Sequence, residues 1–331
     1  MTSPSISIII PMYNTQLYIA SCIESIITQD ILLNIECIII DDCSTDNSYQ
    51  VAFEALSKSN KKNINFHLIR NQMNKGVSYS RNKGLELSKG KYIFFMDSDD
   101  LLPTNALSTL YEGFTDENII IVSGMVLALK ENYYTHRKEW LISQKIKLYK
   151  NDFFISKILC STCNAVWNKL YRAEFVKLER FKEGIINEDS LFLYELSKHM
   201  NINNYELILP INTYYYRNRD NSYCNRGSFK LRCDTCENLR YFYNEIYTSD
   251  KKTSYKIRHV YIKHLYNLLN ELYGRKHLFD NFFPHFYSYW REVSNISILR
   301  SLKGKNKFVG LFIKYLPKYR MLWLKYRLNK I

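Results

Sequence analysis

The first 125 residues alternate short apolar runs with longer, more polar segments. The apolar runs are rich in Ile and Phe and cover residues 6–10, 37–40, 66–69, 92–96 and 119–122. They are nearly continuous rather than alternating, which is typical of strands covered on both faces by other layers. Five strands are therefore predicted.

Helical periodicity occupies the segments between these runs. In the first segment, apolar residues fall on one face of a helix at Ile19, Cys22, Ile23, Ile26 and Ile27. Two more helices are predicted over residues 46–56 and 77–87. Strands that alternate with helices indicate βαβ units, and hence an α/β fold with a mainly parallel sheet flanked by helices.

The predicted strands end in polar residues, and ligands of open parallel sheets bind beyond these carboxyl ends. The fourth strand runs into Asp97, Asp99 and Asp100. Three carboxylates so close together repel one another unless a cation lies among them. Mg²⁺ or Mn²⁺ typically binds one or two carboxylates together with substrate phosphates. The alternative is a solvated acidic turn that caps a helix over residues 101–110.

The second strand ends in Asp41 and Asp42. A carboxylate at this place can accept hydrogen bonds from a ligand, or it can cap the next helix. Neither a G-x-G-x-x-G turn nor a G-x-x-x-x-G-K-[ST] loop occurs in the sequence. Without a glycine cradle, the charge of a bound diphosphate must be met by a metal and by basic side chains, for which Arg81 and Lys75 are candidates.

Four segments between about residues 5 and 103 resemble the N-terminal half of family 2 glycosyltransferases; they read ISIIIPMYN, CIESIITQ, IIIDDCSTDNS and NKGVSYSRNKGLELSKGKYIFFMDSDD. Cys43 departs from the pattern, because the family often has Gly there. The resemblance implies a GT-A fold, which is Rossmann-like. It also implies that Tyr13 stacks on the donor base and that Pro11 supplies a backbone contact. Asp42 would accept from the base, usually uracil, and Arg81 would lie near the nucleotide.

Further roles are implied for the metal and the acceptor. Asp97 would touch ribose or sugar, and Asp99 would bind Mn²⁺ or Mg²⁺ through the diphosphate. Residues 166–171 and 184–192 look like the family's acceptor region, where one residue of an E-D pair is the expected base. We expect Asp189 to be this base, with Glu188 second; the alternative is an N-cap for a helix over residues 190–198. Arg217 suits diphosphate oxygens, or lies at a basic, exposed strand end.

Eight cysteines include two CxxC pairs, Cys160/Cys163 and Cys233/Cys236. Such pairs can bind zinc, but these two lie much further apart in sequence than in compact zinc modules. Reduced thiols in packed helices are the favoured interpretation.

The basic charge is concentrated at the end of the chain. Residues 293–331 hold ten Lys or Arg and no Asp or Glu, against a net charge of +14 for the whole chain. Aromatic and aliphatic residues are interleaved with these cations, and Pro317 would divide the segment into two short helices. This pattern favours amphipathic helices that bind an anionic membrane surface. Nucleic-acid binding is disfavoured because no recognised nucleic-acid motif accompanies the charge.

Three regions are expected: a nucleotide-sugar-binding half over residues 1–125, an acceptor-binding half over 126–225, and a helical extension with the basic tail over 226–331. The predicted function is a metal-dependent, inverting glycosyltransferase that moves a sugar from a UDP-sugar to a glycan, lipid-linked as the tail suggests. By resemblance, the setting is lipopolysaccharide, O-antigen or capsule synthesis. Without a recognisable leader or membrane-spanning run, the expected location is the cytoplasm, at the inner face of the cell membrane. A non-catalytic sugar- or nucleic-acid-binding module is the alternative.

Overall fold

The structure is a computed structural model of the 331-residue chain. It describes residues 3–130, 133–135, 144–149, 165–218 and 229–246, with four single positions at 257, 260, 261 and 264. The chain divides into two compact units, Met1–Arg226 and Gly227–Ile331. The basic tail and the pair Cys160/Cys163 lie outside the described residues.

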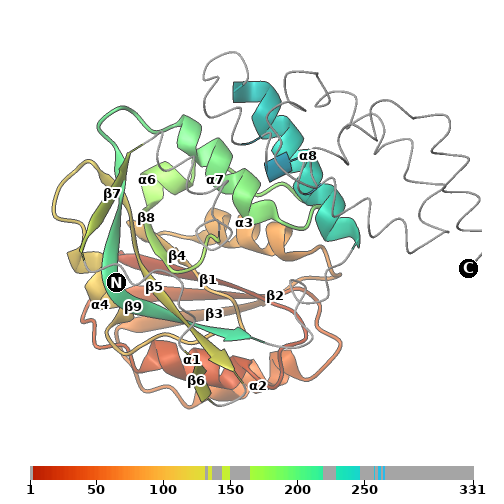
Figure 1. The fold of residues 1–331 in the computed structure, drawn as a ribbon. Helices are drawn as coiled ribbons and strands as arrows, with labels where there is room; N and C mark the ends of the chain where they lie inside the picture. Colours follow the sequence, from red (N-terminus) through yellow and green to blue (C-terminus); the bar gives the residue numbers. More distant parts are fainter. Residues whose placement is uncertain are drawn as a thin grey trace, which may run out of the picture. The chain divides into compact units, whose positions relative to one another are not determined.

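A nine-stranded sheet forms the centre of the first unit, in the order β3-β2-β1-β4-β8-β5-β9-β7 with β6 paired to β5 (Figure 1). The strands are β1 (Ile6–Met12), β2 (Ile35–Asp41), β3 (Ile64–Arg70), β4 (Tyr92–Phe95), β5 (Ile119–Lys130), β6 (Tyr133–Thr135), β7 (Ile146–Tyr149), β8 (Lys169–Arg172) and β9 (Tyr205–Asn218). All pairs among β1, β2, β3 and β4 are parallel. The five predicted strands are present as β1 to β5, and the α/β class is confirmed.

The fifth strand does not continue the parallel series. Strand β8 lies between β4 and β5 and runs antiparallel to both. Leu170 and Tyr171 of β8 are fully buried there. Strand β5 pairs on its other side with β9, in parallel. Local periodicity cannot reveal this insertion, because the pairing joins segments distant in sequence.

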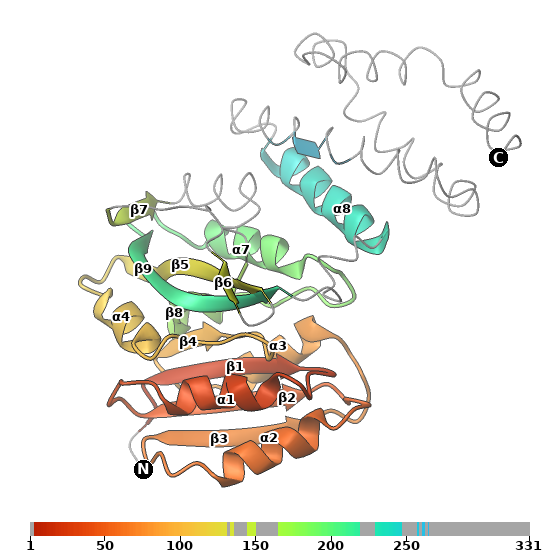
Figure 2. The same cartoon turned by 60° about the horizontal axis from the view of Figure 1, so that its bottom comes forward.

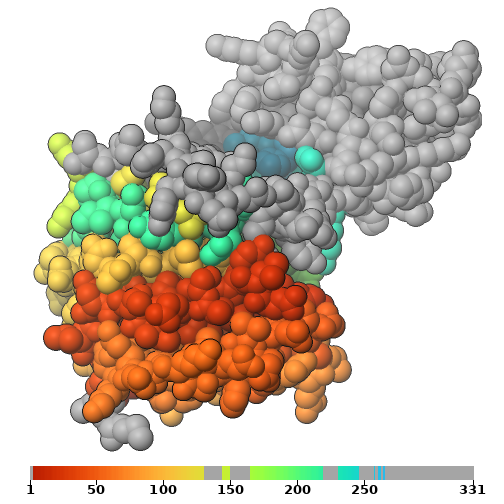
Figure 3. All heavy atoms as spheres, turned by 90° about the horizontal axis from the view of Figure 1, so that it is seen from below, coloured from red at the N-terminus to blue at the C-terminus, as the bar shows by residue number. Residues whose placement is uncertain are grey.

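Helices cover both faces of the sheet. They are α1 (Ile19–Ile27), α2 (Ser48–Ser57), α3 (Val77–Leu87), α4 (Ala106–Glu112), α6 (Ala173–Val176) and α7 (Glu188–Lys198). Helices α1 and α2 lie on one side, and α3 and α7 lie on the other (Figures 1 and 2). Figure 3 looks onto the α1–α2 side, where N-terminal residues, red to orange, form a continuous surface.

The core follows from the alternation of side chains along β1. Ile8 and Ile10 belong to the cluster that includes α1 and α4. Ile9 belongs to the opposite cluster, together with Leu85 of α3 and Phe192 of α7. Both faces of the strand are therefore buried, as its continuous apolar run predicts.

Three helices have bounds that differ from the sequence-based prediction. The helix expected over residues 46–56 spans Ser48–Ser57. The helix expected to begin at Leu101 begins at Ala106, because Leu101 forms a bridge with Tyr215 of β9. The helix expected over residues 190–198 begins two residues earlier, at Glu188.

The second unit contributes one long described helix, α8 (Phe229–Ile246). Its buried face includes Cys236, Leu239, Phe242 and Tyr243, which recur at helical spacing. Within the described residues, none of the helices has the length and apolar character needed to cross a membrane.

Candidate active site

An acidic turn follows β4 at the carboxyl edge of the sheet. Carboxylate oxygens of Asp97, Asp99 and Asp100 all lie within 4.8 Å of one another. Asp100 is 1% exposed, whereas Asp97 and Asp99 are half-buried. In the described part of the chain, this is the one group of three side chains found with the spacing of a metal site.

The electrostatics of this turn suit a divalent cation. Burial raises the pKa of Asp100 well above its usual range, and the charges of Asp99 and Asp97 raise it further. Hydrogen bonds from Arg217 and Tyr214 oppose this rise. A hard cation would relieve the repulsion, and carboxylate oxygens are its preferred ligands. The residues present therefore fit Mn²⁺ or Mg²⁺.

Arg81 joins the acidic turn to the E-D pair. It comes from α3 and is 3% exposed. Its Nη2 lies 3.0 Å from Oδ1 of Asp97, while Nη1 lies 2.5 Å from Oε1 of Glu188 and 2.7 Å from Oδ1 of Asp189. Nearby carboxylates raise the pKa of Arg81, although burial acts to lower it. The guanidinium is therefore positively charged. The guanidinium forms ion pairs with three carboxylates. Its expected position near the nucleotide stays a prediction.

The E-D pair occupies the first turn of α7. The N-cap of this helix is Asn187, so the alternative that Glu188 or Asp189 caps it is wrong. Oδ2 of Asp189 accepts a hydrogen bond from the backbone N–H of Val166 at 3.1 Å. Burial raises the pKa of Asp189 to about 7, although Arg81 acts to lower it. A carboxylate with such a pKa suits general-base chemistry near neutral pH.

Asp42 holds the loop that precedes α3. Its oxygens accept from Nδ2 of Asn71 at 2.8 Å, from N of Lys75 at 3.0 Å and from N of Gly76 at 2.7 Å. The N-cap of α2 is Asn47, so the helix-capping alternative for Asp42 is wrong. A contact between Asp42 and a base stays a prediction.

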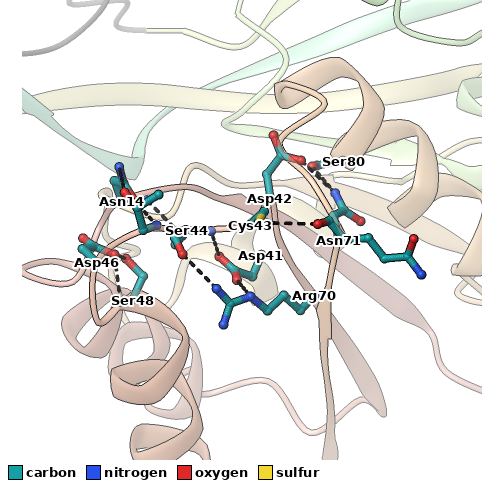
Figure 4. Close-up of polar contacts among 12 residues, drawn as sticks. Asn14, Asp41, Asp42, Cys43, Ser44, Asp46, Ser48, Arg70, Asn71 and Ser80 are labelled. Atoms are coloured by element: carbon teal, nitrogen blue, oxygen red, sulfur yellow. Dashed lines mark hydrogen bonds and ion pairs between the residues drawn. The ribbon is translucent and has the colours of Figure 1, made fainter.

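Figure 4 shows how the loop after β2 is fixed beside Asp42. Asp41 forms an ion pair with Arg70 at 3.2 Å and accepts from N of Ser44 at 3.1 Å. Cys43 has a φ of 59°, and Asn14 on the neighbouring loop has a φ of 52°. The family's usual glycine at position 43 is thereby explained, because this left-handed conformation favours Gly.

Tyr13 and Pro11 lie at the end of β1. Pro11 is buried in the strand, and Tyr13 is 44% exposed just beyond it. An exposed ring at this edge is available to stack on a planar ligand, but nothing in the structure tests that contact.

Arg217 contacts the acidic turn from β9. Its Nε donates to the carbonyl oxygen of Asp99 at 2.9 Å, and its backbone N donates to Oδ1 of Asp100 at 2.7 Å. Its guanidinium carbon lies 5.1 Å from the ring centroid of Tyr18. A basic, exposed strand end does not describe Arg217 fully, because its side chain and its backbone both donate hydrogen bonds to the acidic turn. Its contact with diphosphate oxygens stays a prediction.

Sequence reasoning missed the role of Tyr214. This fully buried hydroxyl donates to Oδ2 of Asp100 at 2.8 Å and accepts from N of Asp97 at 3.1 Å. The only signal was its place in the stretch before Arg217, where a tyrosine is equally compatible with simple core packing.

The remaining cysteine pair is described on α8. Cys236 is buried, and burial raises the pKa of its thiol. The zinc alternative for the other pair stays untested.

Comparison with known proteins agrees with this geometry. The profile described as Glycosyl transferase family 2 matches residues 7–175, just over half of the chain. The chain therefore belongs to glycosyltransferase family 2. "Glycosyltransferase GlyA" of Streptococcus pneumoniae is 29% identical over 196 residues, covering 57% of this chain and 27% of that protein. "Minor teichoic acid biosynthesis protein GgaA" of Bacillus subtilis is 39% identical over 137 residues, covering 40% of this chain and 29% of that protein. The alignments thus span less than a third of either relative.

A solved structure shows the same fold. Residues 1-349 of S. aureus TarS, in complex with UDP-GlcNAc, superpose with a TM-score of 0.67 at 20% identity. The alignment covers 98% of this chain and 92% of that one. The sheet and its flanking helices are thus a GT-A fold.

Proposed function

We propose that the chain transfers a sugar from a UDP-sugar to a glycan hydroxyl, with Mn²⁺ or Mg²⁺ bound at the acidic turn. The observation that carries this proposal is the turn itself. Three carboxylates with oxygens within 4.8 Å of one another lie at the carboxyl edge of the sheet, joined by Arg81 to the E-D pair. A donor-side anion cluster and an acceptor-side base candidate are the two parts that sugar transfer requires.

The donor would lie over the ends of β1, β2 and β4. Tyr13 would stack on the base, Pro11 would supply a backbone contact and Asp42 would accept hydrogen bonds from the base. Asp97 would contact the ribose or the sugar, while Arg217 would contribute positive charge near the diphosphate. The TarS complex with UDP-GlcNAc supports a UDP-sugar donor, because it shares the fold.

Asp99, with the neighbouring carboxylates, would hold the cation. A bound divalent ion supplies charge stabilisation for the departing nucleoside diphosphate. The protein's part is to hold these oxygens together at the sheet edge, where the diphosphate can complete the coordination.

Asp189 is proposed as the base, with Glu188 as its neighbour and second candidate. It would take the proton from the acceptor hydroxyl as that oxygen attacks the anomeric carbon, on the face opposite the departing diphosphate. Such an attack inverts the anomeric configuration. Arg81 and the backbone of Val166 fix both oxygens of Asp189, which orients the carboxylate.

The acceptor is proposed to be a lipid-linked glycan of a bacterial cell-surface polymer, such as lipopolysaccharide, O-antigen or capsule. The teichoic acid relative GgaA supports a cell-surface polymer in general. Ten cations and no acidic residues in residues 293–331 support attachment to an anionic membrane surface, on the cytoplasmic side.

The decisive test is binding of UDP with and without Mn²⁺, measured by titration calorimetry. We expect Mn²⁺ to strengthen UDP binding, and Asp99→Ala to abolish this enhancement with a loss of about tenfold or more. Asp30→Ala is the matched control, because Asp30 is an exposed carboxylate between α1 and the start of β2. Equal UDP affinity with and without metal would favour the non-catalytic binding module.

A panel of UDP-sugars then identifies the donor, since hydrolysis in Mn²⁺ can be followed without the acceptor. The configuration of the transferred product, read by NMR once an acceptor is found, tests inversion. Retention of configuration would contradict the role given to Asp189.

A further inference from the structure

Strand β9 contacts the acidic turn through Tyr214, Tyr215 and Arg217. Leu101 and Tyr215 exchange two backbone hydrogen bonds, at 3.1 and 2.9 Å. Beside them, Arg217 donates to the carbonyl oxygen of Asp99 and to the carboxylate of Asp100. The hydroxyl of Tyr214 contacts both Asp97 and Asp100. The conformation of the turn therefore depends on a strand that lies more than 100 residues later in the chain.

The Tyr214 hydroxyl accepts one hydrogen bond and donates another, so the direction of each bond is determined. It accepts from the amide of Asp97, so its own proton points to Oδ2 of Asp100. Oδ1 of Asp100 accepts from the backbone N of Arg217. The Asp100 carboxylate is thus held at both oxygens, and a carboxylate held in this way keeps one orientation.

Packing fixes the ring that carries this hydroxyl. Trp167 stacks on Tyr214 with a centroid distance of 4.8 Å and an interplanar angle of 16°. Phe94 of β4 contacts the same ring at 6.4 Å between centroids. Because these contacts involve only the ring, removal of the hydroxyl leaves them in place. The hydroxyl can therefore be tested separately from the packing.

We propose that Tyr214 is a positioning residue of the cation site: its hydroxyl holds Asp100 and the backbone at Asp97, and so keeps the acidic turn in the shape that binds a divalent ion. This inference rests on the proposed metal-dependent function. Groups that form hydrogen bonds to metal ligands, and so orient them, commonly contribute about 10–100-fold to metal affinity. Tyr214 belongs to the half of the chain predicted to bind the acceptor, yet its hydroxyl serves the donor side.

The test is the affinity for Mn²⁺ in the presence of saturating UDP, measured by electron paramagnetic resonance of free Mn²⁺. Tyr214→Phe is expected to weaken Mn²⁺ binding by about tenfold or more. Tyr205→Phe is the matched control, because Tyr205 lies in the same strand and its hydroxyl donates to a different carboxylate, that of Asp116. This control is expected to keep the wild-type affinity.

A double-mutant cycle with Asp100→Asn adds a measurement that does not depend on one variant alone. If the hydroxyl acts through Asp100, Tyr214→Phe weakens Mn²⁺ binding much less in the Asp100→Asn background than in the wild type. Additive effects would contradict action through Asp100, and an unchanged Mn²⁺ affinity in Tyr214→Phe would overturn the proposal as a whole.

The wild-type protein separates the two levels of failure. If it binds Mn²⁺ with UDP and Tyr214→Phe binds equally well, only the positioning role is wrong. If the wild type itself binds no Mn²⁺ in the presence of UDP, the metal-dependent function is wrong and the inference falls with it. Circular dichroism and the unfolding temperature confirm that each variant is folded before its affinity is compared.

Discussion

The Nη1 atom of Arg81 lies 2.7 Å from Oδ1 of Asp189, although the two residues are 108 positions apart. The same guanidinium reaches Asp97 through its other terminal nitrogen, at 3.0 Å. One buried cation therefore connects the end of β4 with the start of α7. This relationship makes the proposed base electrostatically dependent on a residue of the donor half.

Replacing Arg81 tests this dependence. Arg81→Met leaves three carboxylates without their shared cation, and breaking a buried ion pair in this way costs about 3–5 kcal/mol. Arg81→Lys keeps the charge but loses the forked geometry, so a smaller loss of stability is expected. Urea unfolding of the two variants measures the difference. Equal stability of Arg81→Met and the wild type would show that the positive charge of Arg81 does not stabilise the fold.

The pKa of Asp189 predicts the pH dependence of transfer. A base is active when deprotonated, and burial raises the pKa of Asp189 to about 7. The rate at saturating substrates should therefore level off above about pH 7 and fall about tenfold for each pH unit below it. Because Arg81 lowers this pKa, an active Arg81→Lys variant with a weaker contact should show its fall at higher pH.

Asp189→Asn tests the assignment of the base directly. The amide keeps the shape of the side chain but cannot take a proton, so transfer should fall by about 10²–10⁴-fold. UDP affinity in the presence of Mn²⁺ should change little. Glu188→Gln is the companion variant, and a larger loss in that variant would exchange the two roles. Full activity of Asp189→Asn would contradict the base assignment and leave the family membership intact.

A packing prediction concerns Gly84 in α3. A Cβ added at this position would clash with Cγ2 of Ile9 in β1. Gly84→Ala should therefore destabilise the protein by about 1–3 kcal/mol despite the higher helix propensity of Ala. Leu87→Ala, at an exposed position of the same helix, should change stability by less than about 0.5 kcal/mol. Denaturant midpoints of the two variants provide the comparison.

The basic tail can be tested by truncation after Ser301. Loss of nine of its ten cations and of its aromatic residues should abolish binding to vesicles rich in anionic lipid. Neutral vesicles serve as the control, because the electrostatic part of the attraction is absent there. Vesicle flotation that is unchanged by the truncation would refute the membrane role.

The sequence by itself determined the strands β1 to β5, the acidic turn and the E-D pair, because each depends on residues that are close together in the chain. Runs of Ile and Phe predict buried strands wherever they occur, and three aspartates in four positions are crowded in any fold. Only the tertiary structure decided which of these groups meet. The insertion of β8, the three carboxylates around Arg81 and the hydroxyl of Tyr214 behind Asp100 all join distant segments. Periodicity reports which face of an element is buried, but not which partner covers that face. The folded sheet decides this, and with it the chemistry of the site.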